Sequence, residues 1–302
     1  MATHQLRTLL EGGAFFEGPR WHDGAWWISD FYRGTVSRLD GAGGEEVVLQ
    51  LEDGAQPSGT GWMPDGSLLV VSMLDHRVLR VAPGGEVTVH AELGAWCGGP
   101  LNDLVVDARG GAYVGNFGFD LMSGVDPAPT SLLRLEPDGA ASVAADGLLF
   151  PNGAVITPDG GTLIVGETFG GRYTAWAIGP DGALSDRRVW AQISLTPALG
   201  SVRSMMDALE FSPDGCGLDA EGHVWSADAI GGRVARIAPG GAIVDEVAAP
   251  DGLGVFACML GGEDGRELVL CAAPDFLAHR RRDTREAVLL ATRVEVPRAG
   301  LP

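Results

Sequence analysis

An internal repeat is the feature that most constrains the fold of this 302-residue chain. Each copy contains an apolar run, a tight turn with glycine, a second apolar run, a polar loop and, in most copies, a run resembling Val-x-Arg-Ile/Leu. The copies begin near Arg20, Gly61, Asp103, Phe150, Gly217 and Ala257. Their spacing matches the roughly 40 to 50 residues of a four-stranded propeller blade. The repeat therefore predicts six similar β units.

The copy at residues 150–182 shows why each unit is expected to be a small antiparallel sheet. Apolar runs at 154–157, 162–167 and 174–178 are rich in Val, Ile and Thr, and turns containing Pro-Asp-Gly end the first and third of them. Such runs, separated by Asp-Gly turns, are typical of β-hairpins. A fourth strand is expected near residues 188–192.

A closed ring fits these units better than an open solenoid, because a ring protects its sheet edges whereas a solenoid needs atypical capping repeats. We therefore predict an all-β fold, a six-bladed β-propeller with four-stranded antiparallel blades. Residues 4–10 are expected to add a strand to the blade formed by the C-terminal residues, which would close the ring. No linker or shift in composition indicates a second domain, so residues 1–302 are expected to form one domain.

The formal net charge of -19 argues against several classes of partner. Such a charge repels phosphate backbones and anionic lipid, so we expect no nucleic-acid and no membrane partner. The N-terminal residues lack the pattern of a secretory signal and no run reaches membrane-spanning length, which favours a cytoplasmic protein. The four cysteines show no CxxC spacing and are expected to be reduced and partly buried. We expect a monomer or weak homo-oligomer.

The repeats allow polar residues to be compared by position. Counting back seven places from the turn residue of five copies leads to Ser58, Asn102, Asn152, Asp214 and Ala257. In the first copy the same count gives Phe16, and the acid Glu17 lies one place along. Equivalent positions of a radial repeat lie at equivalent places around its axis. We therefore expect Glu17, Asn102, Asn152 and Asp214 to converge at the mouth of the central channel.

Two carboxylates and two amide carbonyls form a hard, all-oxygen donor set. Such a set suits one divalent cation, with Ca²⁺ preferred and Zn²⁺, Mg²⁺ or Mn²⁺ as alternatives. Zinc normally recruits His or Cys, and no histidine occupies these positions. Taken singly, Asn152 and Asp214 could be plain turn residues, because Pro-Asn-Gly and Pro-Asp-Gly also occur as simple turns. Their shared repeat position is what favours a common site.

With these residues identified, the chain resembles the SMP-30/gluconolactonase/LRE family, also called the regucalcin-like lactonases. The resemblance covers nearly the whole chain. It is carried by Glu17-Gly18-Pro19-x-Trp21, Asn102-Asp103 with Asp107, Pro151-Asn152-Gly153, and Pro213-Asp214-Gly215 leading into Asp219-Ala220-Glu221-Gly222. The combination is specific, although a single Pro-Asp-Gly is not.

The resemblance implies a six-bladed propeller with one divalent metal in the channel mouth. By motif match, Glu17, Asn152 and Asp214 would be metal ligands, Asn102 would lie on the substrate side of the metal, and Asp214 would also be the general base. Family members typically hydrolyse sugar lactones, and distant relatives hydrolyse phosphotriesters. One departure is that members similar to animal regucalcin carry an arginine where this chain has Pro100. The acyl part of the substrate is therefore expected to be less polar.

These observations predict metal-dependent hydrolysis of a small lactone. The metal would polarise the carbonyl while water attacks, and Asp214 would take the proton. Covalent catalysis is a poor alternative, because the chain has no GxSxG nucleophile elbow. Two other functions stay open. One is phosphotriesterase-like hydrolysis at the same metal, and the other is a non-catalytic calcium-binding propeller.

Three stretches exceed the repeat and are candidates for a substrate lid: residues 120–130, 194–211 and 274–284. Ordinary surface excursions are the alternative for each. Trp96, Phe117 and Phe119 lie near the predicted site in sequence and could form a pocket wall, although core packing is the ordinary role of such aromatics.

Overall fold

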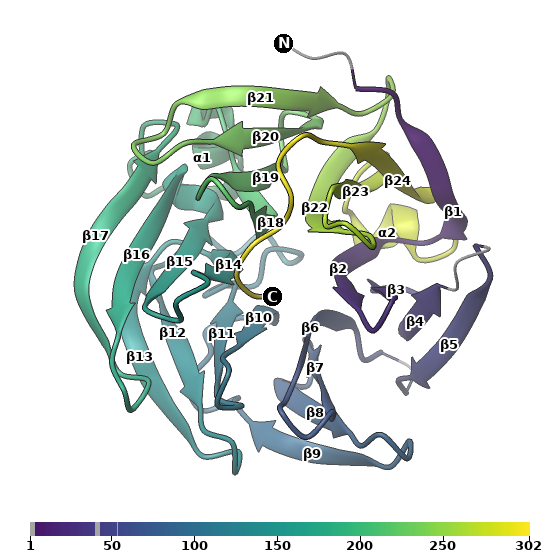
Figure 1. Cartoon of the computed structure of the whole chain (residues 1–302). Helices are drawn as coiled ribbons and strands as arrows, with labels where there is room; N and C mark the ends of the chain where they lie inside the picture. Colours follow the sequence, from purple (N-terminus) through teal and green to yellow (C-terminus); the bar gives the residue numbers. More distant parts are fainter. Residues whose placement is uncertain (1–3, 40–42, 53) are drawn as a thin grey trace.

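The chain folds into six four-stranded antiparallel sheets that surround a central axis, a six-bladed β-propeller (Figure 1). This is a computed structural model, which describes residues 4–39, 43–52 and 54–302. In each of the first five blades the strands follow one another in sequence from the axis outward. The predicted fold class is confirmed.

The strand bounds follow the repeat. The first blade contains β2 (Phe16–His22), β3 (Ala25–Asp30), β4 (Thr35–Leu39) and β5 (Glu45–Gln50), and the second β6 (Pro57–Trp62), β7 (Leu68–Ser72), β8 (Arg77–Val81) and β9 (Val87–Glu92). The third contains β10 (Leu101–Val106), β11 (Ala112–Asn116), β12 (Thr130–Leu135) and β13 (Ala141–Leu148), and the fourth β14 (Pro151–Ile156), β15 (Thr162–Glu167), β16 (Arg172–Ile178) and β17 (Leu184–Gln192). The fifth contains β18 (Pro213–Leu218), β19 (Val224–Asp228), β20 (Arg233–Ile237) and β21 (Ile243–Ala248).

The sixth blade joins the two ends of the chain. It contains β22 (Gly254–Gly261), β23 (Glu267–Ala273) and β24 (Ala287–Arg293), and its outermost strand is β1 (Arg7–Gly13). β1 pairs antiparallel with β24, from Arg7 opposite Ala291 to Gly13 opposite Ala287. The N-terminal strand therefore closes the ring as predicted, three residues later in sequence than expected.

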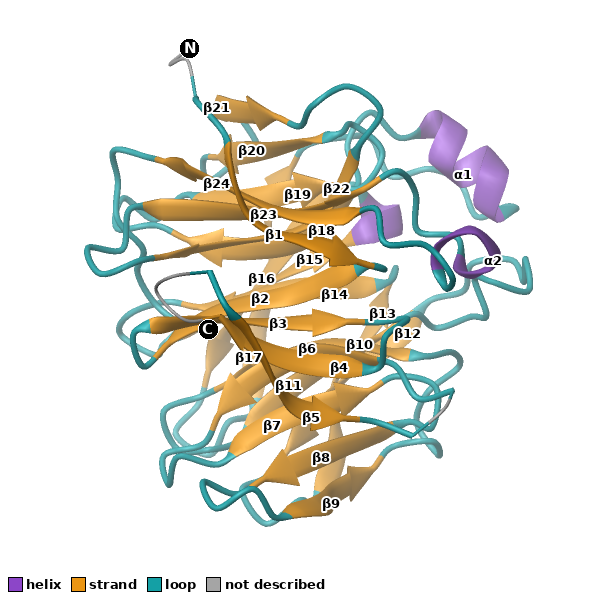
Figure 2. Ribbon diagram, turned by 90° about the vertical axis from the view of Figure 1, so that its right-hand side faces the viewer, coloured by secondary structure: helices purple, strands orange, loops and turns teal. Residues whose placement is uncertain are grey.

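The helices in the described residues are short: η1 (Thr168–Gly170), α1 (Val202–Ala208) and α2 (Ala278–Arg281). In Figure 2, α1 and α2 lie on the same face of the disc, at the end where the innermost strands begin. They belong to two of the three stretches that exceed the repeat. No helix in the described part of the chain is long and apolar enough to cross a membrane.

The C-terminal segment lies across the other face. The Ile156 amide donates to the Leu301 carbonyl at 2.8 Å, and the Ala299 amide donates to the Leu218 carbonyl at 2.8 Å. Ile156 and Leu218 are the last residues of innermost strands β14 and β18. Figure 1 shows this segment, in yellow, running to the centre of the ring. Access to the axis is therefore favoured from the face that carries α1 and α2.

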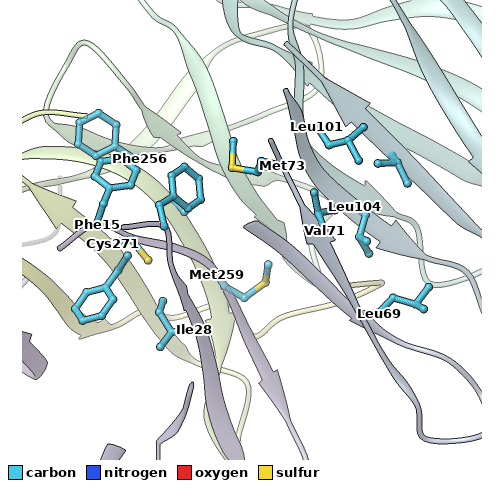
Figure 3. Close-up of a cluster of buried hydrophobic side chains, with 14 of the residues drawn as sticks. Phe15, Ile28, Leu69, Val71, Met73, Leu101, Leu104, Phe256, Met259 and Cys271 are labelled. Carbon is cyan, nitrogen blue, oxygen red and sulfur yellow. The ribbon is translucent and has the colours of Figure 1, made fainter. Parts of the chain in front are cut away.

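Apolar side chains fill the spaces between neighbouring blades. The largest buried cluster joins the first, second, third and sixth blades, and includes Phe15, Ile28, Leu69, Leu104 and Met259 (Figure 3). All five side chains are no more than 3% exposed. The described cysteines are all free, and only Cys97 is not buried, as predicted.

A buried acidic residue at the end of the second strand anchors the loop that leads into the innermost strand of three blades. These residues are Asp30, Glu167 and Asp228, whereas Asn116 at the same place in the third blade bonds within the loop that follows it. Asp30 accepts from the Ala14 amide at 2.8 Å, and Asp228 accepts from the Ser212 amide at 3.1 Å. Since buried polar groups must be hydrogen-bonded, these side chains fix the approach to the axis.

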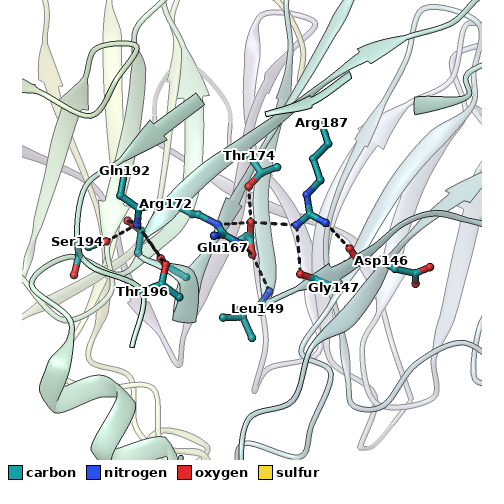
Figure 4. Close-up of polar contacts among 12 residues, drawn as sticks. Asp146, Gly147, Leu149, Glu167, Arg172, Thr174, Arg187, Gln192, Ser194 and Thr196 are labelled. Carbon is teal, nitrogen blue, oxygen red and sulfur yellow. Dashed lines mark hydrogen bonds and ion pairs between the residues drawn. The ribbon is translucent and has the colours of Figure 1, made fainter. Parts of the chain in front are cut away.

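Glu167 shows the anchor most fully (Figure 4). Its carboxylate is fully buried, accepts from the Leu149 amide at 2.9 Å, and pairs with the Arg172 guanidinium at 2.8 Å. The Thr174 hydroxyl also donates to it. Leu149 lies in the loop directly before β14, so this carboxylate positions the start of that strand.

We expect Glu167→Ala to lower the free energy of unfolding by about 3 kcal/mol, because it leaves the Arg172 charge and the Leu149 amide without their partner. Glu136→Ala is the matched control, since Glu136 is 43% exposed and pairs with Arg134 at a longer 3.4 Å. It should cost no more than about 0.5 kcal/mol. Urea unfolding measures both, and equal losses would contradict the anchoring role.

Candidate active site

A cavity lies at the mouth of the channel and is lined by all four residues that the repeat alignment selected. Glu17, Asn102, Asn152 and Asp214 come from the first, third, fourth and fifth blades. Both asparagines are 6% exposed, and the two acids retain partial exposure through the cavity. The structure thus brings together side chains that span about two hundred positions of sequence.

A β-bulge sits beside each of these residues. In β14, Pro151 pairs with Glu167 and Ala154 with Val165, so Asn152 and Gly153 lie opposite a single residue. The same irregularity holds Asn102 in β10 and Asp214 in β18. In β2 the bulge directly follows Glu17. Bulges change the direction of a side chain, and here they occur where the strands enter the ring.

A short hairpin turn in the first blade explains why counting back seven places from the turn gave Phe16 instead of Glu17. His22 pairs with Ala25, which leaves only Asp23 and Gly24 in the hairpin turn. Both have positive φ, 53° and 72°, as a two-residue type I′ turn requires. This turn is shorter than the corresponding turns of the other blades, so counting back from it overshoots by one residue.

In the sixth blade, the residue that reaches the cavity is not the one that the repeat alignment selected. Ala257 pairs regularly with Cys271 and is buried, whereas the bulge falls at Phe256, between Val255 and Ala257. Phe256 lines the cavity and Ala257 does not. In the second blade Ser58 is also buried away from the cavity. The repeat position therefore predicts the neighbourhood of the site, and the bulge decides which side chain reaches it.

Glycine lets the bulges of neighbouring blades approach closely. A Cβ atom at Gly153 would lie 2.5 Å from the Asp214 carbonyl oxygen, and one at Gly215 would lie 2.7 Å from the Ala257 Cβ. Both distances are below any normal contact. The glycine after Asn152 and after Asp214 is therefore a packing requirement of the ring.

The two asparagines have different hydrogen bonds. The Asn152 amide nitrogen donates to the Thr168 hydroxyl at 3.0 Å, and that hydroxyl donates to the Pro213 carbonyl at 2.7 Å. The Asn152 amide oxygen is thereby left as an acceptor at the cavity. The buried Asn102 amide nitrogen has no hydrogen-bond partner. An unsatisfied buried donor is uncommon, and this one is available to a ligand.

Burial and mutual repulsion disfavour ionisation of the two acids. Burial, and then the charge of Asp214, raise the pKa of Glu17 well above its usual value. Burial raises the pKa of Asp214 to about 8, against the opposing effect of a hydrogen bond from the Asn152 side chain. The charge of Asp103 raises both pKa values further. A cation between the acids would relieve this repulsion.

Beneath the site, Arg20 and Asp103 form a buried ion pair. The Arg20 Nη2 atom lies 2.6 Å from the Asp103 Oδ1 atom, and Arg20 is 3% exposed. The guanidinium also donates to the Thr60 carbonyl at 3.0 Å and the Leu104 carbonyl at 3.1 Å. Since its donors are engaged by other groups, Arg20 lowers the pKa of Glu17 only as a minor contribution.

The residues present fit a hard divalent cation. Among residues 4–39, 43–52 and 54–302, no group of three or more His, Cys, Asp or Glu is placed to hold a metal ion. A cation here would therefore use amide oxygen together with the Glu17 and Asp214 carboxylates. Carboxylate and amide oxygens are the donors that Ca²⁺ prefers.

The walls of the cavity are apolar, and most of their residues were not selected from the sequence. Eight aromatic residues line it: Phe15, Phe31, Tyr32, Phe117, Phe150, Phe169, Phe256 and Phe276. Phe117 was a candidate for the wall and does line the cavity. Phe119 does not, and its ring packs against that of Phe150 with 5.9 Å between the ring centroids. Trp96 is 40% exposed and is not part of the lining.

Several wall residues that were not selected from the sequence also occupy equivalent positions in the repeat. Phe15, Phe150 and Ser212 each lie two places before Glu17, Asn152 and Asp214, respectively. Residues directly after the second strand also line the cavity: Phe31, Phe117, Thr168 and Ala229. These two repeat positions account for half of the lining residues other than Glu17, Asn102, Asn152 and Asp214.

Comparison with known proteins gives a consistent result. The sequence profile of the SMP-30/Gluconolactonase/LRE-like region matches residues 15–274. The chain is 26% identical to a 6-deoxy-6-sulfogluconolactonase from Pseudomonas putida over 91% of this chain and 88% of that protein. It is 29% identical to pentonolactonase XacC from Haloferax volcanii over 72% and 68% of the respective chains. A calcium-binding protein, regucalcin, from Agrobacterium tumefaciens shares the fold, with a TM-score of 0.78 and 21% identity over 100% of this chain and 99% of that one.

The raised pKa of Asp214 predicts how pH affects metal-free protein. A carboxyl that binds its proton more tightly in the folded state loses stability as pH rises from its unfolded pKa, near 4, toward its folded pKa of about 8. Glu17 acts in the same direction. We therefore expect the free energy of unfolding, measured with chelator, to fall across this range.

Asp214→Asn should remove much of that fall and stabilise metal-free protein at pH 8 by about 2 kcal/mol. The exposed residue Asp251 supplies the control, and Asp251→Asn should follow the parent protein. Chemical denaturation at pH 5 and pH 8 makes the comparison. A parent profile that is flat, or a variant that loses stability at pH 8, would contradict the electrostatic description.

Proposed function

The chain belongs to the SMP-30/gluconolactonase/LRE-like family, and we propose that it is a metal-dependent lactonase that opens the ester ring of a small lactone. The proposal rests above all on Glu17, Asn102, Asn152 and Asp214 lining one cavity. The names of the curated relatives, which describe lactonases, support the reaction class. The Ca²⁺ ion is the preferred cofactor because every available ligand is a hard oxygen.

Glu17, Asn152 and Asp214 would hold the cation. When bound, it supplies Lewis-acid polarisation of the lactone carbonyl. The Thr168 hydroxyl accepts from the Asn152 amide nitrogen and so orients the amide oxygen toward this role. Glu167 and Asp228 fix the loops before Asn152 and Asp214, which keeps both strand entries in place without requiring the cation.

Asn102 would act on the substrate. Its buried, unpartnered amide nitrogen can donate to the lactone carbonyl oxygen, and that bond strengthens as negative charge develops during attack. Such a donor is already positioned and desolvated, so little reorganisation is needed during the reaction.

Asp214 would handle the proton. As water attacks, its oxygen bonds to the carbonyl carbon and Asp214 takes the proton that the water loses. The ring C–O bond then breaks, and the departing alkoxide receives that proton to give the hydroxy acid. The apolar walls limit the access of other water molecules to this step.

Chelation should abolish lactone hydrolysis, and added Ca²⁺ should restore it. Hydrolysis can be followed by proton release on a panel of lactones, with metal content measured in parallel. Metal uptake without turnover on any lactone would instead support a non-catalytic calcium-binding propeller. Turnover of a fluorophosphate but of no lactone would support a phosphotriesterase.

Two substitutions separate the proposed roles. Asn102→Ala should lower kcat about 100-fold while metal content stays unchanged, because it removes a donor to the carbonyl and no ligand. Asp214→Asn should lower both metal affinity and kcat, the latter at least about 100-fold. Asp251→Asn should change neither. Full metal content together with full turnover in Asp214→Asn would refute both roles assigned to that residue.

A further inference from the structure

The cavity has a polar floor and almost entirely apolar walls. Apart from Glu17, Asn102, Asn152 and Asp214, only Thr168 and Ser212 among its 18 lining residues are non-aromatic polar residues. Eight lining residues are aromatic and four more are Leu, Met or Ala. This division separates the atoms that would meet the reacting ester from those that would meet the rest of the substrate.

Two aromatic groups form the inner walls. The ring centroid of Phe15 lies 5.2 Å from that of Phe31 and 4.9 Å from that of Phe256. These rings belong to the first and sixth blades. The ring of Phe150, at the entry to the fourth blade, stacks on the ring of Phe117 of the third blade, with 4.1 Å between the ring centroids. In a ring of six, the first blade stands opposite the fourth and the sixth opposite the third, so the two aromatic groups face each other across the axis.

The wall around Phe150 includes a strained backbone. Phe150 has a φ of 60°, which is unusual for an aromatic residue, and it directly precedes Pro151 at the start of β14. Its ring is 5% exposed. Backbone strain of this kind persists only where the surroundings hold it, and it is found preferentially at functional sites. Here it places an aromatic ring beside Asn152.

The rim is made by the stretches that exceed the repeat. Residues 120–130 supply Leu121 and Met122, residues 194–211 supply Met206 of α1, and residues 274–284 supply Phe276. Met122 is 49% exposed and the others are partly exposed. Each of the three stretches therefore contributes an apolar side chain, and none contributes a charged one.

The polar atoms of the wall already have partners within the protein. The Tyr32 hydroxyl donates to the Phe276 carbonyl at 2.7 Å, and the Ser212 hydroxyl donates to the Thr168 carbonyl at 3.0 Å. The Thr168 hydroxyl is engaged by Asn152 and Pro213. No Arg, Lys or His occurs among the residues that line this cavity. Substrate hydroxyl groups would lose water here without gaining new bonds, which is unfavourable.

We infer that the substrate is a lactone with an apolar alkyl or aryl substituent, and not a polyhydroxylated sugar lactone. This inference rests on the proposed lactonase activity. The ester lies at the polar floor and the substituent lies between the facing aromatic groups, extending toward the Met122 and Met206 rim. Aromatic and thioether side chains adapt well to such apolar groups.

Paired substrates test the inference with the metal-loaded protein. We expect kcat/KM for δ-decalactone and dihydrocoumarin to exceed that for glucono-δ-lactone by at least tenfold, with unsubstituted δ-valerolactone between them. Hydrolysis of any of these lactones that is lost on chelation supports the general function. A preference for glucono-δ-lactone would then overturn the substrate inference alone.

Non-hydrolysable analogues keep the test informative if turnover is absent. Equilibrium binding of the lactam matching δ-decalactone should be at least tenfold tighter than binding of gluconolactam. If the apolar lactam binds but no lactone is hydrolysed, the cavity inference stands and the lactonase proposal fails. Equal or tighter binding of gluconolactam would overturn the cavity inference.

A rim substitution locates the contact. Met206→Gln keeps a good helix former in α1 but adds a polar group to the rim, and it should reduce the ratio of kcat/KM for δ-decalactone over δ-valerolactone about fivefold. Leu195→Gln is the control, because Leu195 is 85% exposed and lies outside the lining. It should leave the ratio unchanged. An unchanged ratio in Met206→Gln would contradict the placement of the substituent at α1.

Discussion

The close approach of the innermost strands around the axis is the constraint on which the rest of the structure depends. Each of these strands carries a bulge, and glycine follows Glu17, Asn152 and Asp214 because a larger residue would collide with the neighbouring blade. The bulges direct the side chains of Asn102, Asn152 and Asp214 to the mouth of the ring, whereas Asp103, in the same bulge as Asn102, is buried in an ion pair with Arg20. Ring closure by β1 and β24 then holds the blades in place.

The same packing creates the electrostatic character of the site. Glu17 and Asp214 line the same confined cavity, and burial is the largest cause of the raised pKa of both acids. A protein interior favours such an arrangement only if protons or a cation compensate the charge. The apolar walls strengthen this effect and, at the same time, restrict which molecules can enter. The proposed metal binding and the proposed substrate preference therefore share one physical origin.

The sequence predicted the blades well because turns and strand periodicity are local properties. It also selected Glu17, Asn102, Asn152 and Asp214, since a radial repeat converts sequence position into position around the axis. It did not distinguish Phe256 from Ala257, because the location of a bulge depends on how neighbouring strands pack. The rim residues, such as Met206, were not predicted individually, since they lie in stretches outside the repeat.

The central claim is that Glu17, Asn152 and Asp214 surround one cation. Crystals grown with Mn²⁺ as a substitute for Ca²⁺ test it directly, because anomalous scattering locates the ion without reference to activity. The account predicts one strong peak at the channel mouth, within about 2.5 Å of an oxygen of each of these three side chains. A peak elsewhere, or an ion bound without Asn152 and both carboxylates, would contradict it.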